Sequence, residues 1–385
     1  MNNSFGTYII ILLLFLFNPL AGIGASIIYA LKTEEIRDVI FFSVLVVLLM
    51  TAINFTKEAT NDQFRYAHFF LSVPKSELSH LLLSREKPEY AYVLLNYFIY
   101  YLSGGNASFF FVSVTIIIYG LLFKSVIRWA NYSETSVYML VSGILCVAFF
   151  TNFLTLSLHL IRQMLAVSVF FYYLILRLEK NRLCWICFVL APLFHNSIIL
   201  IEILTVIPYI YDKITILRVA LLFAIVFCFS IGIPSIASSI IEEVGVEGYV
   251  IERAAELEGE MDSSGSFSIK TLMMVMVPLI ICSVSNIIRD KKFSMVPTLC
   301  IMWCLIVLGL SYAPLAQYRF FFMLYFFIPF VLPQLFEKNT IMSKWYCLVI
   351  ICFFFTRFWT TLDSQNFVYG DTMEFIVCPY FWHFL

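Results

Sequence analysis

Long apolar runs separated by short polar breaks fill most of the 385 residues. A membrane-spanning helix needs about 20 consecutive apolar residues. Several runs are shorter or merge, so the pattern predicts an all-α polytopic membrane bundle of about 11–12 spanning helices, with some broken or re-entrant segments. The runs occupy 7–30, 37–56, 88–103, 106–127, 135–156, 160–178, 183–200, 198–211, 215–236, 269–289, 295–313, 319–336 and 342–360.

The runs follow one another without a linker or a clear internal repeat, so we expect a single integral membrane domain over 1–385. An irregular bundle fits this pattern better than a transporter built from repeats. The first run lacks the basic flank of a cleaved signal peptide, and we expect it to be a retained first span.

Composition supports the same class of protein. Hydrophobic residues make up 62% of the chain and charged residues only 13%, against about 25% in a soluble domain. Membrane lipid is therefore an expected partner, because lipid must cover the apolar outside. A net charge of −1 gives no field that would favour nucleic acid, so no nucleic acid is expected.

The cysteines indicate neither a disulfide framework nor a metal site. Nine of the ten lie inside apolar runs, where they behave as small hydrophobes. Cys184 and Cys187 have the spacing of a redox or metal pair, but no second pair completes four ligands. The sequence also lacks a Gly-rich phosphate loop and a Gly-x-Ser-x-Gly elbow. We therefore predict no metal and no cofactor.

Lysine and arginine in short loops predict the orientation, because these residues favour the cytoplasmic side. We assign five basic loops to the cytoplasm. The connections between them then face outside, including the segment 237–268, which carries eight carboxylates against Arg253 alone. The five loops contain Lys124/Arg128, Arg177/Lys180/Arg182, Lys213/Arg218, Arg289/Lys291/Lys292 and Lys338/Lys344.

The membrane side on which the charged segment 57–87 lies depends on the next two runs. If 88–103 and 106–127 both span the membrane, the segment lies in the cytoplasm. If one of them is re-entrant, it lies outside. Run 88–103 has only 16 residues, and the outside placement is favoured on the functional grounds given below.

Charges next to or within apolar runs are costly and are therefore functional candidates. Asp62, Arg65 and Tyr66 follow the second run at positions that share a helix face. They form either an intrahelical ion pair at the interface or a carboxylate that an arginine orients toward a cavity. Glu89 follows Pro88 at a helix start, where the dipole favours a carboxylate. Its alternative role is to act as a general base or to bind a substrate hydroxyl.

The strongest candidate cluster is His159, Arg162 and Gln163, which share a helical face at the start of an unbroken apolar run. An arginine in that position opposes the helix dipole unless an anion lies beside it. We therefore predict a bound phosphate or carboxylate, in preference to an arginine that only extends to the interface.

Two later breaks carry polar groups as well. His195 follows Pro192 and lies either at the tip of a surface hairpin or in a cavity, as a neutral base or hydrogen-bond donor. Tyr318 and Arg319 repeat the arrangement of Arg162 at the start of a later run.

This set of residues suits an activated substrate, one that already contains a good leaving group, such as a lipid-linked diphosphate. Arginines would hold the diphosphate through charge-assisted hydrogen bonds. A carboxylate or histidine would take the proton of an attacking sugar hydroxyl. Asp62, Glu89 and His195 are the alternatives for that base.

The same residues resemble the Wzy/EpsG family of polysaccharide polymerases, over roughly 55–325. Asp-x-x-Arg-Tyr at 62–66 looks like the Asp-Tyr-x-x-Tyr region of that family. Lys-Pro-Glu-Tyr at 87–90 is similar to its Glu-Pro-Gly-Phe element, although the glycine is missing and the acid is displaced. Arg162-Gln163 and Phe-His-Asn-Ser at 194–197 resemble its Arg-Gln and Phe-His-x-Ser block, and Tyr318-Arg319 resembles its late arginine.

The resemblance implies a glycosyltransferase of the bacterial inner (cytoplasmic) membrane, an O-antigen or polysaccharide polymerase whose active site faces the periplasm or exterior. The enzyme would transfer a growing glycan from undecaprenyl diphosphate onto the next lipid-linked repeat unit, with inversion and without a metal. Its product would be a lipopolysaccharide O-antigen, a capsule or an exopolysaccharide. A chain-length regulator and a flippase are expected partners, beside the undecaprenyl-diphosphate-linked oligosaccharide itself.

On this hypothesis ten residues form the site. Those expected to be catalytic are Asp62, Glu89 and His195, and those expected to bind substrate are Arg65, Tyr66, His159, Arg162, Gln163, Tyr318 and Arg319. Two other functions stay open, namely a lipid-linked oligosaccharide transporter and a membrane sugar acyltransferase.

Overall fold

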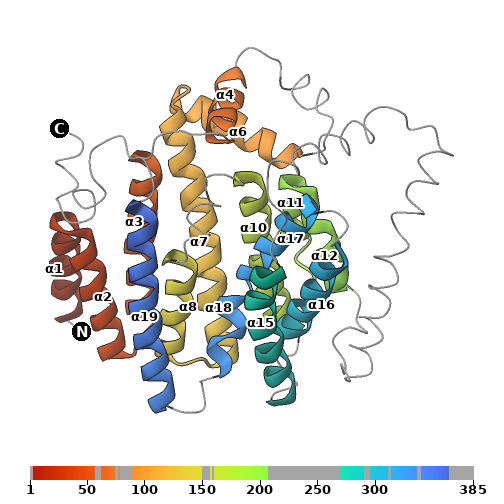
Figure 1. Cartoon of the computed structure of the whole chain (residues 1–385). Helices are drawn as coiled ribbons and strands as arrows, with labels where there is room; N and C mark the ends of the chain where they lie inside the picture. Colours follow the sequence, from red (N-terminus) through yellow and green to blue (C-terminus); the bar gives the residue numbers. More distant parts are fainter. Residues whose placement is uncertain are drawn as a thin grey trace. The chain divides into compact units, whose positions relative to one another are not determined.

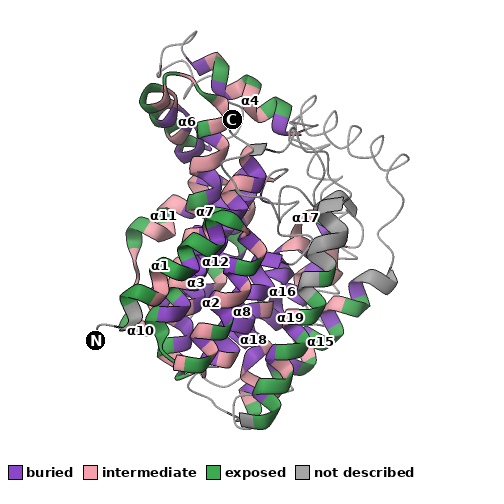
Figure 2. Cartoon of the chain, turned by 90° about the vertical axis from the view of Figure 1, so that its left-hand side faces the viewer, coloured by how far each residue is buried: buried purple, intermediate pink, exposed green. Residues whose placement is uncertain are grey.

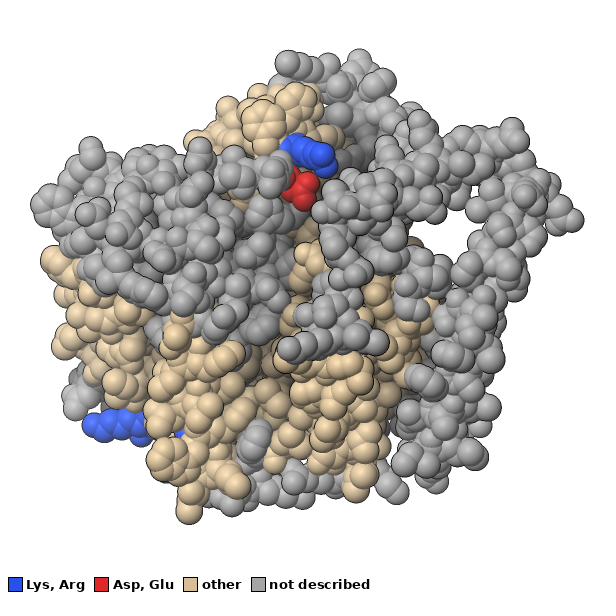
Figure 3. All heavy atoms as spheres, in the orientation of Figure 1, with Lys and Arg blue, Asp and Glu red and all other residues tan. Residues whose placement is uncertain are grey.

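The computed structural model describes residues 3–56, 62–73, 89–149, 160–206, 269–289, 295–310, 314–335 and 340–363, together with Leu78 and Ser157. Within these ranges the regular elements are all helices. Four of them are long and apolar enough to cross a membrane, and seven shorter apolar helices accompany them. The prediction of an all-α polytopic membrane protein is confirmed. On the face shown in Figure 3, charged side chains of described residues are visible near the top and at the lower left.

The chain forms two compact units, 1–202 with 336–385 and 203–335. The single domain predicted over 1–385 stays a prediction. The helices of the first unit are α1 (Asn3–Phe17), α2 (Pro19–Thr33), α3 (Ile36–Thr56), α4 (Asp62–Ser72), α6 (Tyr90–Ser103), α7 (Ala107–Ser133), α8 (Val137–Phe149), α10 (Ile161–Lys180), α11 (Trp185–Phe194), η2 (Asn196–Ile198) and α19 (Thr340–Asp363), and α12 (Ile199–Val206) leads out of it.

Helix α7 is the centre of the first unit, since it packs against α3, α10, α8 and α6 (Figure 1). Its inner positions are large and apolar, and Phe110, Ile118 and Tyr119 are fully buried. Asn54 near the end of α3 donates a 2.8 Å hydrogen bond to Thr115 near the start of α7. The end of α3 and the start of α7 therefore lie at the same end of the unit.

Helices α7 and α10 run in the same direction. Arg128, in the last turns of α7, donates to Glu179 at the end of α10, with N–O distances of 2.6 to 3.1 Å. Arg162, at the start of α10, precedes Glu179 by 17 residues, or about 26 Å of helix. This separation approaches the hydrocarbon thickness of a bilayer, which is about 30 Å. The two arginines thus lie near opposite ends of the spanning region.

Run 88–103, one of the shorter predicted runs, forms no helix long enough to span the membrane. Its helix α6 has 14 residues, about 21 Å, which is too short to span. The Glu89 side chain at one end of α6 contacts Arg162 at the start of α10, and Asn106 after the other end caps α7. Figures 1 and 2 show α4 and α6 together where α7 begins. Both ends of α6 thus lie beside the starts of other helices, and the membrane side of 57–87 stays a prediction.

Run 7–30 is also not one span, because it folds into the hairpin of α1 and α2. Pro19 is the first residue of α2, and the Asn18 side chain caps that helix by accepting a 2.9 Å hydrogen bond from the backbone of Ala21. The two helices pack closely. A Cβ added at Gly22 would lie 2.4 Å from the Cα of Phe15, so only glycine permits this approach.

The second unit holds α15 (Ile269–Arg289), α16 (Met295–Gly309), α17 (Pro314–Tyr325), α18 (Ile328–Val331) and η6 (Pro333–Leu335). Trp303 stacks on Phe320 with ring centroids 5.1 Å apart. Asn286 donates to the carbonyl of Val331 at 2.9 Å and so ties α15 to α18. Run 319–336 is broken between α17 and α18. The predicted run 215–236 and the acidic segment 237–268 lie outside the described residues.

Candidate functional site

An ion pair between Arg162 and Glu89 lies where α6 and α10 begin. Arg162 is the second residue of α10, and its Nη1 donates to Oε2 of Glu89. The Glu89 side chain is 1% exposed and that of Arg162 is 31% exposed. Glu89 is the N-cap residue of α6, but its side chain makes no capping hydrogen bond. Glu89 thus lies at the helix start, as predicted, but its carboxylate is directed at the arginine and not at the helix N-terminus.

His195 is the third member of this cluster. Its Nε2 lies 3.9 Å from Oε1 of Glu89, so each carboxylate oxygen faces a different nitrogen base. The backbone N–H of Ser197 donates to Nδ1 of His195 at 3.2 Å, and the Ser197 hydroxyl lies 2.7 Å from the same nitrogen. A neutral imidazole that accepts at Nδ1 carries its proton on Nε2. His195 therefore presents an N–H toward Glu89.

Local backbone chemistry places His195 here. Helix α11 ends at Phe194, just after Pro192, and His195 itself is extended, with φ −160° and ψ 125°. The η2 turn then starts with His195 as its cap. The break that the sequence predicted at this point is real, and it directs the imidazole toward α6, against which α11 packs.

Two tyrosine rings surround the guanidinium of Arg162. The Cζ atom lies 6.0 Å from the ring centroids of both Tyr66 on α4 and Tyr92 on α6, which is within the range of cation–π attraction. The two rings meet edge to face at 6.1 Å. Tyr66 is also hydrogen-bonded to Arg162. Burial raises the pKa of the Tyr66 phenol, so the phenol stays protonated, and its oxygen accepts the hydrogen bond that the guanidinium of Arg162 donates.

Arg162 thus has a protein anion beside it. The sequence predicted that an anion must offset the helix dipole at this position, and Glu89 supplies one. The pair does not use every donor of the guanidinium, because Nε of Arg162 makes no hydrogen bond within the described part of the chain. A bound phosphate stays a prediction.

The other predicted residues are dispersed. Asp62 and Arg65 form an i, i+3 pair on α4 at 3.5 Å, and 85% of the Arg65 side chain is exposed. Arg65 therefore does not share the direction of Tyr66, as the helical spacing had suggested. Gln163 is buried beside Arg162. Tyr318 and Arg319 belong to the second unit, and His159 lies outside the described residues.

Tyr92 is a site residue that the sequence reasoning missed. It is fully buried and lies three residues after Glu89, on the same face of α6. This spacing could have identified it, but Tyr92 is one of several tyrosines in an aromatic helix. Among the described residues, no three His, Cys, Asp or Glu side chains gather closely enough to hold a metal ion.

The chemistry available at this cluster is clear. A buried carboxylate is held between a fixed cation and an imidazole N–H, and both partners are partly accessible. Arginine is suited to oxyanions such as phosphate. The carboxylate is suited to accept a proton from a hydroxyl.

Comparison with known proteins gives one match. The model of the EpsG family matches residues 39–377, which is most of the chain. No curated protein and no solved structure matches the sequence. The matched region contains α4, α6, α10 and α11, and thus the whole cluster of Glu89, Arg162 and His195.

Proposed function

We propose that this chain, which belongs to the EpsG family of Wzy-like polysaccharide polymerases, transfers a growing glycan from undecaprenyl diphosphate onto the next lipid-linked repeat unit. In this reaction the anomeric carbon leaves the diphosphate oxygen and bonds to a sugar hydroxyl. The hydroxyl proton passes to a protein base, and the lipid diphosphate departs. Configuration inverts, because a single displacement occurs.

The observation that carries this proposal is the cluster of Glu89, Arg162 and His195. Arg162 is partly exposed, and its guanidinium has further N–H groups besides the Nη1 donor that contacts Glu89, so it would bind the diphosphate through its exposed side. Stabilising the leaving group as its charge develops is the main task of such a site. The sugar hydroxyl would reach Glu89 between Arg162 and His195, because their side chains are partly exposed whereas Glu89 is buried.

Glu89 is our choice of base among the three candidates. It contacts both the arginine and the histidine, whereas Asp62 pairs with Arg65 on α4. His195 accepts at Nδ1 and directs its proton toward Glu89, so its lone pair is already used. We assign to His195 the role of a hydrogen-bond donor that positions the carboxylate or the attacking hydroxyl.

We also propose that the cluster faces the periplasm or exterior of a bacterial inner membrane. Arg162 lies at the opposite end of α10 from Arg177 and Lys180, which belong to a basic loop of the kind that favours the cytoplasm. The segments α4 and α6 lie at the Arg162 end. A flippase would deliver the lipid-linked units to that side, and a chain-length regulator would act with the polymerase.

Replacement of Arg162 tests the function. The Arg162→Ala variant, at normal protein level, is expected to lose polymer while single repeat units are still displayed on the lipid carrier. Polymer of normal length in that variant would contradict the proposal. Repeat units held at the inner leaflet in a deletion strain would indicate a transporter instead, and loss of acetyl groups with intact polymer would indicate an acyltransferase.

A further inference from the structure

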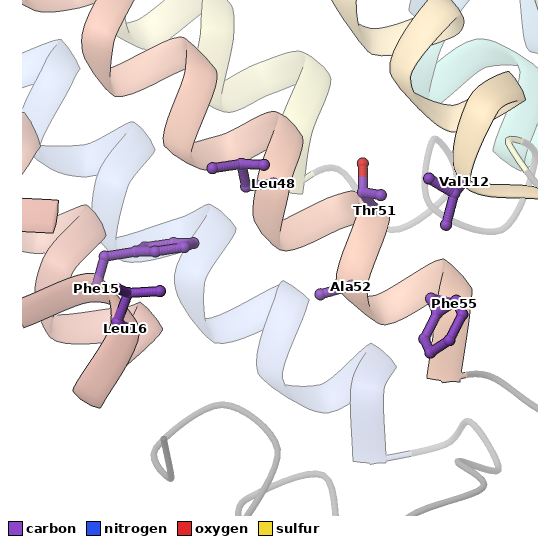
Figure 4. Close-up of a pocket in the computed structure, with 7 residues that line it drawn as sticks. All are labelled: Phe15, Leu16, Leu48, Thr51, Ala52, Phe55 and Val112. Carbon is purple, nitrogen blue, oxygen red and sulfur yellow. The ribbon is translucent and has the colours of Figure 1, made fainter. Parts of the chain in front are cut away.

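An apolar groove lies on the first unit between α1, α3 and α7. It encloses about 360 Å³ and is lined by Phe15 and Leu16 of α1, Leu48, Ala52 and Phe55 of α3, and Val112 of α7. Figure 4 shows the α1 residues on one side of α3 and Val112 on the other. Helix α1 precedes the residues 39–377 that match the EpsG family. The groove is therefore formed in part by a segment outside that match.

Among the described residues that line the groove, no side chain has a free hydroxyl, amide or charge directed at a ligand. Thr51 is the one polar residue of the groove, and its hydroxyl donates to the carbonyl of Val47 within α3 at 2.7 Å. A sugar, a phosphate or a chain of water molecules would lose its own hydrogen bonds there without replacement. The chemistry of the lining therefore selects hydrocarbon.

The groove opens to the surface that the membrane covers. Leu16 is 41% exposed and Leu48 is 43% exposed, and both lie in helices of the apolar bundle. From Leu48 to Phe55 the groove follows two turns of α3, about 10 Å. Because α3 ends where α7 begins, the groove lies in the half of the membrane nearest Arg162. A chain that descends from the interface at that end would enter it lengthwise.

We infer that this groove binds one acyl chain of a membrane phospholipid from the leaflet nearest Glu89 and Arg162. Phospholipid is the bulk component of that leaflet, and the groove is continuous with the surface that it already covers. The bound chain fills the gap between the α1–α2 hairpin and the rest of the unit. Arg162 belongs to α10, which does not line the groove, so this site is separate from the one proposed for the glycan substrate.

Photocrosslinking tests the occupant directly in the full chain. Leu48→benzoylphenylalanine places a photoreactive ring at the mouth of the groove, and the partial exposure of Leu48 leaves room for it. Illumination of the protein purified in detergent, after bulk lipid has been removed, is expected to give an adduct with the mass of one phospholipid. Val44→benzoylphenylalanine is the control, since Val44 is 51% exposed on the same helix but does not line the groove. Its phospholipid adduct is expected to be about tenfold weaker.

The inference is overturned by equal labelling at 44 and 48, by an adduct with residues 364–385 of the chain itself, or by an adduct with a polyisoprenoid lipid.

A second variant, Ala52→Phe, fills the groove from its α3 side. Native mass spectrometry of the purified protein is expected to show about tenfold less retained phospholipid than for the matched Val44→Phe variant. Unchanged retention would overturn the inference as well.

Discussion

Two arginine–glutamate pairs lie at opposite ends of α10, and their surroundings differ. Arg128 and Glu179 are joined by three hydrogen bonds, and their side chains are 30% and 21% exposed. Arg162 and Glu89 have one short contact, and the glutamate is almost fully buried with His195 on its other oxygen. Both arginines lie near tyrosine rings, so aromatic neighbours do not separate the two pairs.

The two pairs differ in how completely the partners use each other's hydrogen-bonding groups. The Arg128–Glu179 pair is bidentate, a geometry in which the arginine fork and the carboxylate satisfy each other. In the other pair the carboxylate is shared between the arginine and the histidine, and the buried Nε of the arginine makes no hydrogen bond to a described residue. The comparison indicates that an ion pair near a membrane interface is a functional candidate when its members can still form hydrogen bonds with a ligand. The variants below test that distinction.

Matched removal of each carboxylate should have the largest effect. Glu89→Gln is expected to reduce polymer formation by about 10² to 10⁴, the range that a positioned base contributes. Glu179→Gln should leave the rate within about twofold, since its pair serves only to join α7 to α10. Polymer length on gels, corrected for the amount of protein in the membrane, measures both.

Asp62→Asn is the control for the identity of the base. Asp62 pairs with Arg65 on α4, so the change should reduce the rate far less than Glu89→Gln does. If Asp62→Asn is the inactive variant and Glu89→Gln is active, Asp62 is the base and our assignment is wrong.

Exchanging the arginine and the glutamate within each pair should also affect polymer formation differently in the two pairs. In Arg128→Glu/Glu179→Arg the attraction is restored in the opposite sense, and polymer formation is expected within about threefold of normal. In Glu89→Arg/Arg162→Glu the pair is again neutral, so the protein should still reach the membrane. It should nevertheless form no polymer, because the phosphate-binding cation and the base have changed places. Activity in the second exchange would show that only the attraction matters there.

Sequence reasoning identified Glu89, Arg162 and His195, but not that they meet. Each stands at a polar break in an apolar run, where the cost of a charge marks it as a candidate. Their contact depends on the position of α6. Hydropathy alone does not predict that position, because a run of 16 residues is of marginal length for a spanning helix. The contact between Glu89 and Arg162 places the start of α6 beside the start of α10, and such a tertiary contact has no signature in local periodicity.

The same limit explains the other differences. Asp62, Arg65 and Tyr66 share a helix face by spacing, yet long side chains on one face can point apart, and only Tyr66 reaches Arg162. The division of run 7–30 at Asn18 and Pro19 was visible in the sequence as a cap and a helix start. Hydropathy averaged over the run concealed it.

His195 and Ser197 should give an intermediate effect. His195→Asn removes the N–H that faces Glu89 and is expected to reduce the rate about 10- to 100-fold. Ser197→Ala removes only the hydroxyl beside Nδ1 and keeps the backbone donor, so a loss of about threefold to tenfold is expected. A loss from Ser197→Ala as large as that from His195→Asn would show that the hydroxyl has a role of its own. Purified variants with a lipid-linked repeat unit as substrate provide the rates.

The tyrosines should give the smallest effect, because each pair keeps its charges. Tyr66→Phe retains the ring beside Arg162 and removes the hydroxyl that bonds to it, so the rate should fall about threefold to tenfold. Tyr172→Phe makes the same change beside Lys124 and Arg128, whose ring distances are 5.0 and 5.8 Å, and should leave the rate unchanged. The raised pKa of Tyr66 keeps its phenol protonated through neutral and moderately alkaline pH, so the ratio of the Tyr66→Phe rate to the normal rate should not vary between pH 6 and about pH 9. A ratio that changes across that range would show that the phenol ionises there, contrary to this prediction.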